Sequence, residues 1–194
     1  MAERAEHRVV RDPTDADDAR AAAEGLVARR DLYQMRRPLP VPDDRRGSAP
    51  AVSTRAFRPG VDDEVWLGVN NRAFRWHPEQ GDWTQADLAS RLVEPWFDPE
   101  GFRLYEEEGR LVGFCWTKVH ADHEPPLGEI FVIAVDPGVH GRGLGRDLTL
   151  VGLDWLHARG LTVGMLYVDT TNLAAVRLYE NLGFTVHHRD RLYR

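Results

Sequence analysis

The sequence is poor in cysteine and has no long apolar run, and each shortage excludes a class of protein. Its single cysteine, Cys115, excludes an internal disulfide framework and favours a reducing compartment. No apolar run approaches the roughly 20 residues of a membrane helix. The first 20 residues are too charged for a secretory signal. We therefore expect a soluble, cytoplasmic protein with no membrane partner.

An excess of positive charge is also lacking. Lysine and arginine total 25 against 31 aspartates and glutamates, which gives a formal charge of −6 and a pI near 5.7. A nucleic-acid binder needs a basic face to neutralise phosphates, so we expect no nucleic-acid partner. Lys118 is the single lysine, and the other 24 of the 25 basic residues are arginine. A GC-rich genome explains the excess of arginine, because its codons favour that residue. The alternative is that Lys118 stands where a compact, titratable ammonium is needed in place of a planar guanidinium.

The length of 194 residues fits one ordinary domain with a short additional segment. Proline, charged and small residues at 38–51 indicate a linker. Upstream of it, residues 17–30 predict a helix and 31–36 a short strand, with too little apolar surface for an independent core. We therefore divide the chain into residues 1–37, the linker 38–51 and a domain at 52–194.

The domain at 52–194 has the element order β-α-α-β-β-β-α-β-α-β, which is typical of a mixed α/β sandwich. The predicted strands are 52–57, 102–107, 111–119, 129–135, 161–168, 184–189 and a short one at 191–194, and the predicted helices are 61–74, 84–93, 144–159 and 172–182. Residues 129–135 are nearly all apolar, as expected of a central strand covered on both faces. Thr84 and Asp87 have capping-box spacing.

Glycines concentrate between the apolar strand and the helix that follows it, in the sequence VDPGVHGRGLGR at 135–146. Gly141, Gly143 and Gly145 let backbone N–H groups turn toward an anion, and the helix directs its positive end to the same place. Arg142 and Arg146 add positive charge. The spacing matches neither GxxxxGK[ST] nor the dinucleotide fingerprint. The loop predicts a pyrophosphate cradle, with a plain tight turn as the alternative.

The order of motifs resembles that of the GCN5-related N-acetyltransferase family. A strand leads to a Q/R-x-x-G-x-G/A loop, a helix and a strand, and then to NLAAVRLYENLGF at 172–184, which matches N-x-x-A-x-x-x-Y-x-x-x-G-F. The resemblance covers 52–194 and departs at His140, where the family has Gln or Arg. It implies a GNAT fold, an α/β fold with a mixed, mostly antiparallel central sheet flanked by helices. A splayed central strand pair would bind acyl-CoA, with acetyl-CoA as co-substrate.

A narrower resemblance is to the C-terminal catalytic domain of the mycothiol synthase family. It rests on HPEQGDWT at 77–84, VGFCWTKVH at 112–120, GEIFVIAVDP at 128–137 and MLYVDTTNLAAVRLYENLGF at 165–184. It implies acetylation of a small-molecule amine, the cysteinyl amine of Cys-GlcN-Ins. Residues 24–40 are similar to the end of that family's first acetyltransferase domain, so we expect 1–37 to be a remnant of it, degenerated or shortened at the gene start. Apolar surface that the missing part of the first domain would have covered would then be exposed. We expect a monomer or a weak dimer.

The resemblance also implies the catalytic residues. If the hairpin around 119–128 is regular, Lys118 and Glu129 lie opposite each other on one face of the sheet. An ordinary ion pair is the alternative to a role in which both reach the substrate and Glu129 is the general base. Tyr179 is the implied general acid, with a core tyrosine as the alternative. Glu79 and Tyr167 are the other implied substrate contacts. The alternatives are that Glu79 only forms part of a turn and that Tyr167 only packs within its strand.

The resemblance places acetyl-CoA contacts on the central strand, the glycine loop and the last helix. They are Ile133, Ala134, Val135, His140, Gly141, Arg142, Gly143, Leu144, Gly145, Arg146, Asn172, Ala175 and Arg177. The segment from His120 to His123 lacks further ligands at recognised metal spacing, so we expect no metal. Two other functions stay open. One is acetylation of another small amine or a protein N-terminus, and the other is a catalytically silent acyl-CoA-binding remnant.

Overall fold

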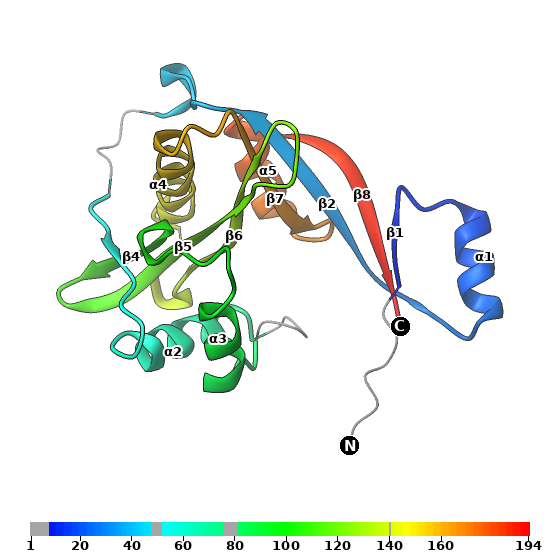
Figure 1. Ribbon diagram of the computed structural model, residues 1–194, viewed down its shortest axis with the longest axis horizontal. Coiled ribbons are helices and arrows are strands. Elements are labelled where there is room, and N and C mark those ends of the chain that lie inside the picture. Colours follow the sequence, from blue (N-terminus) through cyan, green and yellow to red (C-terminus); the bar gives the residue numbers. More distant parts are fainter. Residues whose placement is uncertain (1–7, 48–51, 76–80, 140) are drawn as a thin grey trace. The chain divides into compact units, whose positions relative to one another are not determined.

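The computed structural model of the chain describes residues 8–47, 52–75, 81–139 and 141–194 (Figure 1). The chain divides into two compact units. We call Pro38–Gly164 the central unit, and Met1–Arg37 together with Met165–Arg194 the terminal unit. Within the described residues, none of the helices is both long and apolar enough to cross a lipid bilayer.

The central unit is built on an antiparallel sheet in the order β6-β5-β4-β3. Its strands are β3 (Arg55–Ala56), β4 (Phe102–Glu107), β5 (Arg110–His120) and β6 (Leu127–Val135). Its helices are α2 (Asp63–Ala73), α3 (Gln85–Leu92) and α4 (Leu144–Ala158), and short 3-10 turns occur at η1 (Asp43–Arg45), η2 (Pro99–Gly101) and η3 (Pro137–Val139). The helices cover both faces of the sheet, α4 on one and α2 with α3 on the other (Figure 1).

An aromatic core fills the space between the sheet and helices α2 and α3. Trp66 of α2 meets Phe102, Phe114 and Trp116 of the sheet at ring-centroid distances of 5.2–5.8 Å, with the rings edge to face. Edge-to-face packing is favourable because the positive ring edge meets the negative ring face. This core packs against one face of β5 up to Trp116, two residues before Lys118.

Local signals give most element ends in the central unit. Thr84 and Asp87 form the predicted capping box at the start of α3, and α4 ends just before Gly160, which has the left-handed φ of +83°. The strand predicted at 52–57 is wrong in length, because β3 contains only Arg55–Ala56. The Thr54 carbonyl accepts a hydrogen bond from the Arg103 side chain, which takes the place of a strand partner.

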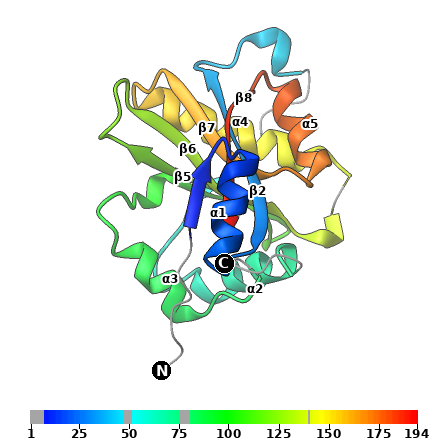
Figure 2. The same ribbon diagram turned by 90° about the vertical axis from the view of Figure 1, so that its right-hand side faces the viewer.

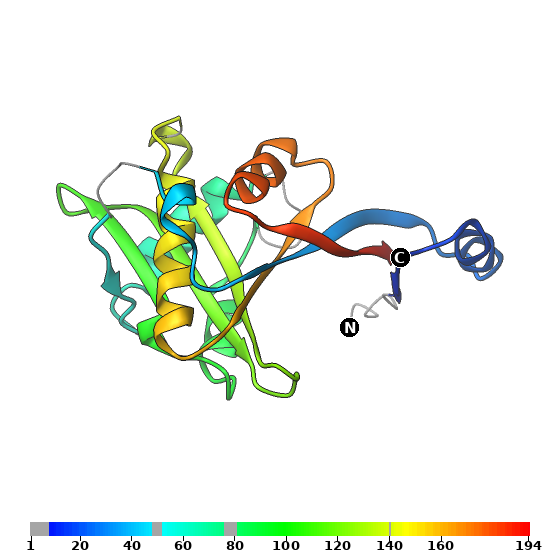
Figure 3. The same ribbon diagram turned by 90° about the horizontal axis from the view of Figure 1, so that it is seen from above.

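The terminal unit contains β1 (Arg8–Arg11), α1 (Asp15–Ala23), α5 (Leu173–Asn181), β8 (Thr185–Tyr193) and most of β2 (Ala28–Pro38) and β7 (Val163–Asp169). Its strand order is β1-β8-β2-β7. Strands β2 and β8 are antiparallel and run side by side in Figures 1 and 3, and helix α1 faces the viewer in Figure 2. Two predicted strands at 184–189 and 191–194 are one continuous strand, β8, because β2 pairs along its whole length.

The helix predicted at 17–30 is also wrong in extent. Helix α1 begins and ends earlier, at Asp15 and Ala23, and Gly25 then turns the chain with a φ of +79°. A left-handed φ ends a helix, so the residues after it are free to extend. Strand β2 therefore starts at Ala28 and is longer than the predicted 31–36. The division into 1–37, 38–51 and 52–194 stays a prediction.

Candidate active site

Lys118 on β5 and Glu129 on β6 are direct cross-strand partners, as predicted from the hairpin. Cross-strand partners in an antiparallel pair direct their side chains to the same face of the sheet. The register shifts just beyond them, because Thr117 pairs with Ile130 and Trp116 with Val132. Phe131 is thus the extra residue of a β-bulge, a feature that re-aims side chains next to functional sites.

Two aromatic rings surround the Lys118 ammonium. Its Nζ lies 4.8 Å from the centre of the Trp96 ring and 5.8 Å from that of Phe131, the bulged residue. A cation above a ring face is attracted by the ring quadrupole, and this fixes a side chain that is otherwise flexible. The only lysine of the chain is therefore held on the Glu129 face of the sheet.

Glu129 is buried, with 7% of its surface exposed, and its carboxylate contacts a histidine. The His120 Nε2 lies 2.7 Å from the Glu129 Oε2. His120 is two residues beyond Lys118, so both side chains lie on the face that carries Glu129. Our sequence interpretation considered His120 only as a metal ligand and missed this pair. The diagonal relation between positions 120 and 129 places both side chains on one face of the hairpin, but their contact also depends on the two rotamers.

His120 also lies near Asp122 and His123 of the following turn. One possible ligand atom from each of the three residues lies within 4.8 Å of the others. Tetrahedral zinc with ligands at ~2.1 Å separates its ligand atoms by only about 3.4 Å. Ligand atoms as far apart as 4.8 Å would have to move closer to share such an ion. The absence of a metal stays a prediction.

The burial of strand β6 decreases along its length. Residues 127–130 are buried, whereas Ile133, Ala134 and Val135, the predicted pantetheine contacts, are half-buried. Val135 lies six positions beyond Glu129, which corresponds to about 20 Å of extended strand. The strand therefore connects the Lys118–Glu129 pair at one end to the glycine loop at the other.

The glycine loop has the backbone conformation that glycine permits. Gly141 and Gly143 have left-handed φ angles of +82° and +81°, and a Cβ at either position would meet no atom within 4 Å. Glycine is thus required there for the conformation and not for space. Gly143 caps α4, and Leu144 and Gly145 open the helix, with Leu144 buried in the core. The loop is exposed in front of a 15-residue helix with its N-terminal amides directed toward it.

Protein groups bind both arginines of the loop. Arg142 makes a bidentate ion pair with Glu107 of β4, at 2.7 and 2.8 Å. Arg146 donates to the backbone carbonyls of Arg45 and Arg46 in η1 and the turn after it. The Arg142 side chain is half exposed, so solvent weakens its ion pair and an incoming anion competes for it more easily than for Arg146. His140 lies outside the described residues.

Asp136, which follows β6 directly, anchors the start of the loop and was missed in the sequence. It is 3% exposed, accepts hydrogen bonds from the Arg72 side chain of α2 at 2.6 Å and from the Gly138 amide at 2.9 Å, and lies 3.5 Å from the Arg110 guanidinium. Burial raises the pKa of Asp136, but the hydrogen bonds from Arg72 and Gly138 outweigh it, so the net pKa is lowered. The ionised carboxylate thus links β6, α2 and the loop.

The terminal unit contains the predicted general acid, Tyr179, and one predicted substrate contact, Tyr167. Tyr179 of α5 is 8% exposed, and its ring lies 5.8 Å from that of Phe184. Tyr167 of β7 is 41% exposed, and its hydroxyl accepts a hydrogen bond from the Gln34 side chain at 2.7 Å. The general-acid role of Tyr179 and the substrate contact of Tyr167 stay predictions. Glu79 lies outside the described residues.

Asn172 begins α5 as predicted. Its side chain accepts a hydrogen bond from the Ala175 amide at 3.2 Å, which satisfies one of the free donors of the first helical turn. Ala175 is half-buried, and Arg177, one turn of helix beyond Leu173, is exposed. This explains Asn172 structurally, and the acetyl-CoA contacts of the three residues stay predictions.

Cys115 lies inside the central unit. It is fully buried on β5, and burial raises the pKa of its thiol to about 12. A thiol with this pKa is protonated at neutral pH and does not act as a nucleophile. Cys115 is therefore a packed strand residue.

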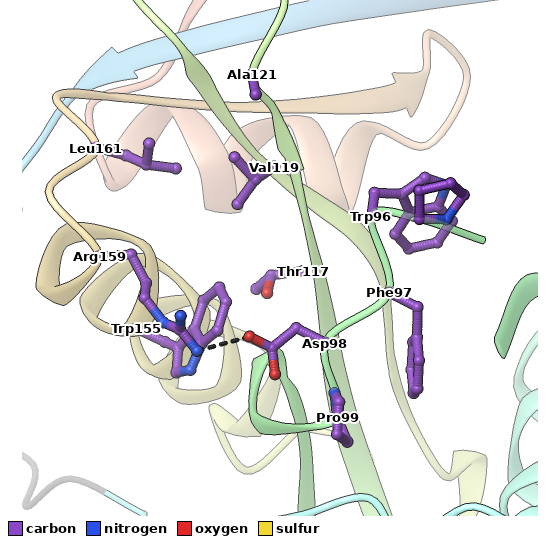
Figure 4. Close-up of a pocket in the computed structure, with 11 residues that line it drawn as sticks. Trp96, Phe97, Asp98, Pro99, Thr117, Val119, Ala121, Trp155, Arg159 and Leu161 are labelled. Carbon is purple, nitrogen blue, oxygen red and sulfur yellow. Dashed lines mark hydrogen bonds and ion pairs between the residues drawn. The ribbon is translucent and has the colours of Figure 1, made fainter. Parts of the chain in front are cut away.

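A cavity of about 680 Å³ opens in the central unit between β5, α4 and the segment after α3. Figure 4 shows Thr117 and Val119 of β5 together with Trp155 and Arg159, which pairs with Asp98 at 2.6 Å. Thr117 and Val119 alternate with Lys118, so they lie on the α4 face of the sheet. This cavity is thus on the opposite face from Lys118 and Glu129.

Comparison with known proteins supports the fold and gives the family. A mycothiol acetyltransferase of Thermomonospora curvata is 54% identical over 178 residues, which are 90% of this chain and 58% of that protein. A mycothiol acetyltransferase of Thermobispora bispora is 55% identical over 177 residues, 90% of this chain and 60% of that protein. The chain thus spans less than two thirds of the length of these relatives.

The solved structure of a GCN5-related N-acetyltransferase from Sphaerobacter thermophilus is 26% identical, with a TM-score of 0.72 over 96% of this chain and 58% of that one. The fold class predicted from the sequence is confirmed. A sequence profile described as "Acetyltransferase (GNAT) family" matches residues 56–184. Since this match includes β6, the glycine loop and α5, the chain belongs to the Acetyltransferase (GNAT) family.

Proposed function

We propose that this chain transfers the acetyl group of acetyl-CoA to the cysteinyl amine of Cys-GlcN-Ins, the reaction of a mycothiol acetyltransferase. The observation that carries the proposal is the cross-strand pair formed by Lys118 of β5 and Glu129 of β6. Strand β6 then leads directly to the glycine loop. Identity of 54–55% to relatives named mycothiol acetyltransferase favours this acceptor over other amines.

The residues of the central unit suit acetyl-CoA. Exposed amides at Gly141 and Gly143, before the N-terminus of α4, would hold the pyrophosphate. The half-buried end of β6 at Ile133, Ala134 and Val135 would lie along the pantetheine arm. When bound, acetyl-CoA supplies an acyl group activated as a thioester.

Glu129 would receive the proton that the acceptor amine loses as its nitrogen bonds to the acetyl carbon. An α-amine titrates near ~8, so the base needs little strength and must above all be correctly placed. Lys118, held by Trp96 and Phe131, would bind polar groups of the acceptor. Tyr179 keeps the role that the family resemblance gives it, donation of a proton to the departing CoA thiolate.

The test is product formation by the 194-residue chain with acetyl-CoA and Cys-GlcN-Ins, followed by mass because the acceptor carries its own thiol. Glu129→Gln is expected to lower kcat by about 10²- to 10⁴-fold, the usual contribution of a general base. Glu64→Gln, at an exposed position of α2, is the matched control and is expected to leave kcat unchanged.

Three other results would contradict the proposal in different ways. Turnover with another small amine or an N-terminal peptide, and none with Cys-GlcN-Ins, would replace the acceptor and keep the chemistry. Binding of acetyl-CoA without turnover on any amine would identify a silent acyl-CoA-binding protein. Full turnover by both Glu129→Ala and Tyr179→Phe would remove the assigned base and acid.

A further inference from the structure

The Glu129 carboxylate has two oxygens, and His120 occupies one of them. The His120 Nε2 lies 2.7 Å from the Oε2. An ionised carboxylate only accepts hydrogen bonds, so beside an ionised Glu129 the hydrogen of this contact belongs to Nε2. The Oε1 is then the oxygen left to face an incoming amine.

The strand register brings the two residues together. Glu129 lies opposite Lys118, and His120 lies opposite Leu127, so His120 and Glu129 are diagonal neighbours on one face of the hairpin. His120 comes from the last position of β5, before an exposed turn, whereas Glu129 is buried within β6. A contact between two strands restricts the Glu129 rotamer more firmly than β6 alone would.

The polar neighbours of His120 have other contacts or lie in solvent. The Lys118 ammonium is held over Trp96 and Phe131. The His123 ring meets the His120 ring edge to face at 5.9 Å, and Asp122 lies exposed in the turn. His120 is thus the residue of this group that hydrogen-bonds to Glu129.

We infer that His120 is a positioning residue for acetyl transfer: its Nε2–H holds the Glu129 Oε2 and thereby aims the Oε1 at the acceptor amine. This rests on the proposed function, in which Glu129 is the base. Displacing a catalytic group by ~1 Å costs up to about a hundredfold in rate, so a lost orienting hydrogen bond has a measurable effect.

The inference is tested by steady-state kinetics of three variants at position 120. His120→Ala is expected to lower kcat about ten- to a hundredfold, with the KM for acetyl-CoA unchanged. His120→Gln places an amide nitrogen near the former Nε2 and is expected to recover most of that loss. His120→Phe fills the volume without a donor and is expected to stay slow, which keeps the test valid if the alanine variant does not fold. His123→Ala is the matched control on the same turn.

A double-mutant cycle shows whether His120 acts through Glu129. In the Glu129→Gln background, adding His120→Ala is expected to cost less than twofold, since the aimed oxygen no longer serves as a base. If Glu129→Gln is slow but His120→Ala is as active as His123→Ala, the inference is overturned and the proposed function stands. If Glu129→Gln keeps full turnover, the base assignment fails and the inference fails with it. Equal rates in the Gln and Phe variants would also overturn the positioning role.

Discussion

At the scale of single residues, face and register were predictable and side-chain contacts were not. The alternation of a strand gives the face of Lys118 and Glu129, and the length of the hairpin gives their pairing. The His120 contact depends on rotamers at two diagonal positions, which no spacing rule specifies. The Asp136 contacts with Arg72 and Arg110 join three elements and have no local pattern.

Asp62, at the start of α2, gives a residue-scale prediction about acid stability. It is 3% exposed and accepts from the Arg55 and Arg58 side chains at 2.7–3.3 Å and from the Arg58 amide. Burial raises the pKa of Asp62, but these hydrogen bonds outweigh it and hold the pKa well below its ordinary value. Its stabilising effect is therefore complete above the unfolded pKa of ~3.9 and is lost as the pH falls toward the folded pKa.

Asp62→Asn is expected to lower the free energy of unfolding at pH 7 by about 2–3 kcal/mol, because two arginines lose a buried partner while staying partly solvated. Urea unfolding at pH 7 and pH 2.5 checks this. The difference between wild type and variant should shrink at the lower pH. An equal difference at both values, or the same loss in the exposed control Asp44→Asn, would contradict the assignment.

At the scale of elements, caps and stops follow from local chemistry, whereas strand length follows from partners. The Thr84–Asp87 box and the Asn172 cap are short-range hydrogen bonds, so the sequence alone predicts them. Strand β3 is short and β8 is long because of Arg103 and β2, which lie far away in the sequence. The Phe131 bulge is likewise a property of a strand pair and not of one strand.

Helix α4 packs on the sheet through a glycine. A Cβ on Gly152 would lie 2.5 Å from the Cys115 Sγ and 2.6 Å from the Ile130 Cδ1. Gly152→Ala is therefore expected to destabilise the protein by about 1–3 kcal/mol, although alanine favours helices. Gly68→Ala in α2 is the matched control, since the nearest atom is the flexible end of Arg72 at 3.3 Å. It is expected to stabilise by about 0.5–1 kcal/mol. Thermal unfolding measures whether each variant is more or less stable than the wild type. A higher stability of Gly152→Ala would contradict the close contact.

At the scale of the whole molecule, the N-terminal segment is part of a sheet. Strand β2 lies between β8 and β7 in the strand order, and Arg191 of β8 binds Asp31 of β2 and Asp18 of α1 at 2.7–2.9 Å. These partners are more than 150 residues apart in the sequence. Hydrophobic periodicity within a short stretch of sequence can therefore predict that β2 is a strand, but not which strands it pairs with.

Deletion variants test how much the terminal unit depends on this segment. Removal of residues 1–27 takes away β1 and α1 but leaves β2 beside β8. Removal of residues 1–38 also takes away β2, so both neighbours of β8 in the described sheet are lost. Hydrogen exchange is expected to leave the amides of β8 protected in the shorter deletion and unprotected in the longer one. Equal protection in both would contradict the role of β2.

The depth of Cys115 has a consequence for a protein proposed to act on a thiol. The acceptor in the proposed reaction carries a free sulfhydryl, and CoA is released as another. An accessible cysteine beside them would be open to mixed disulfides, which require a thiolate and a path to it. The chain's single cysteine is buried and stays protonated at neutral pH. In the proposed reaction, the folded protein would therefore offer these low-molecular-weight thiols no thiolate of its own with which to exchange.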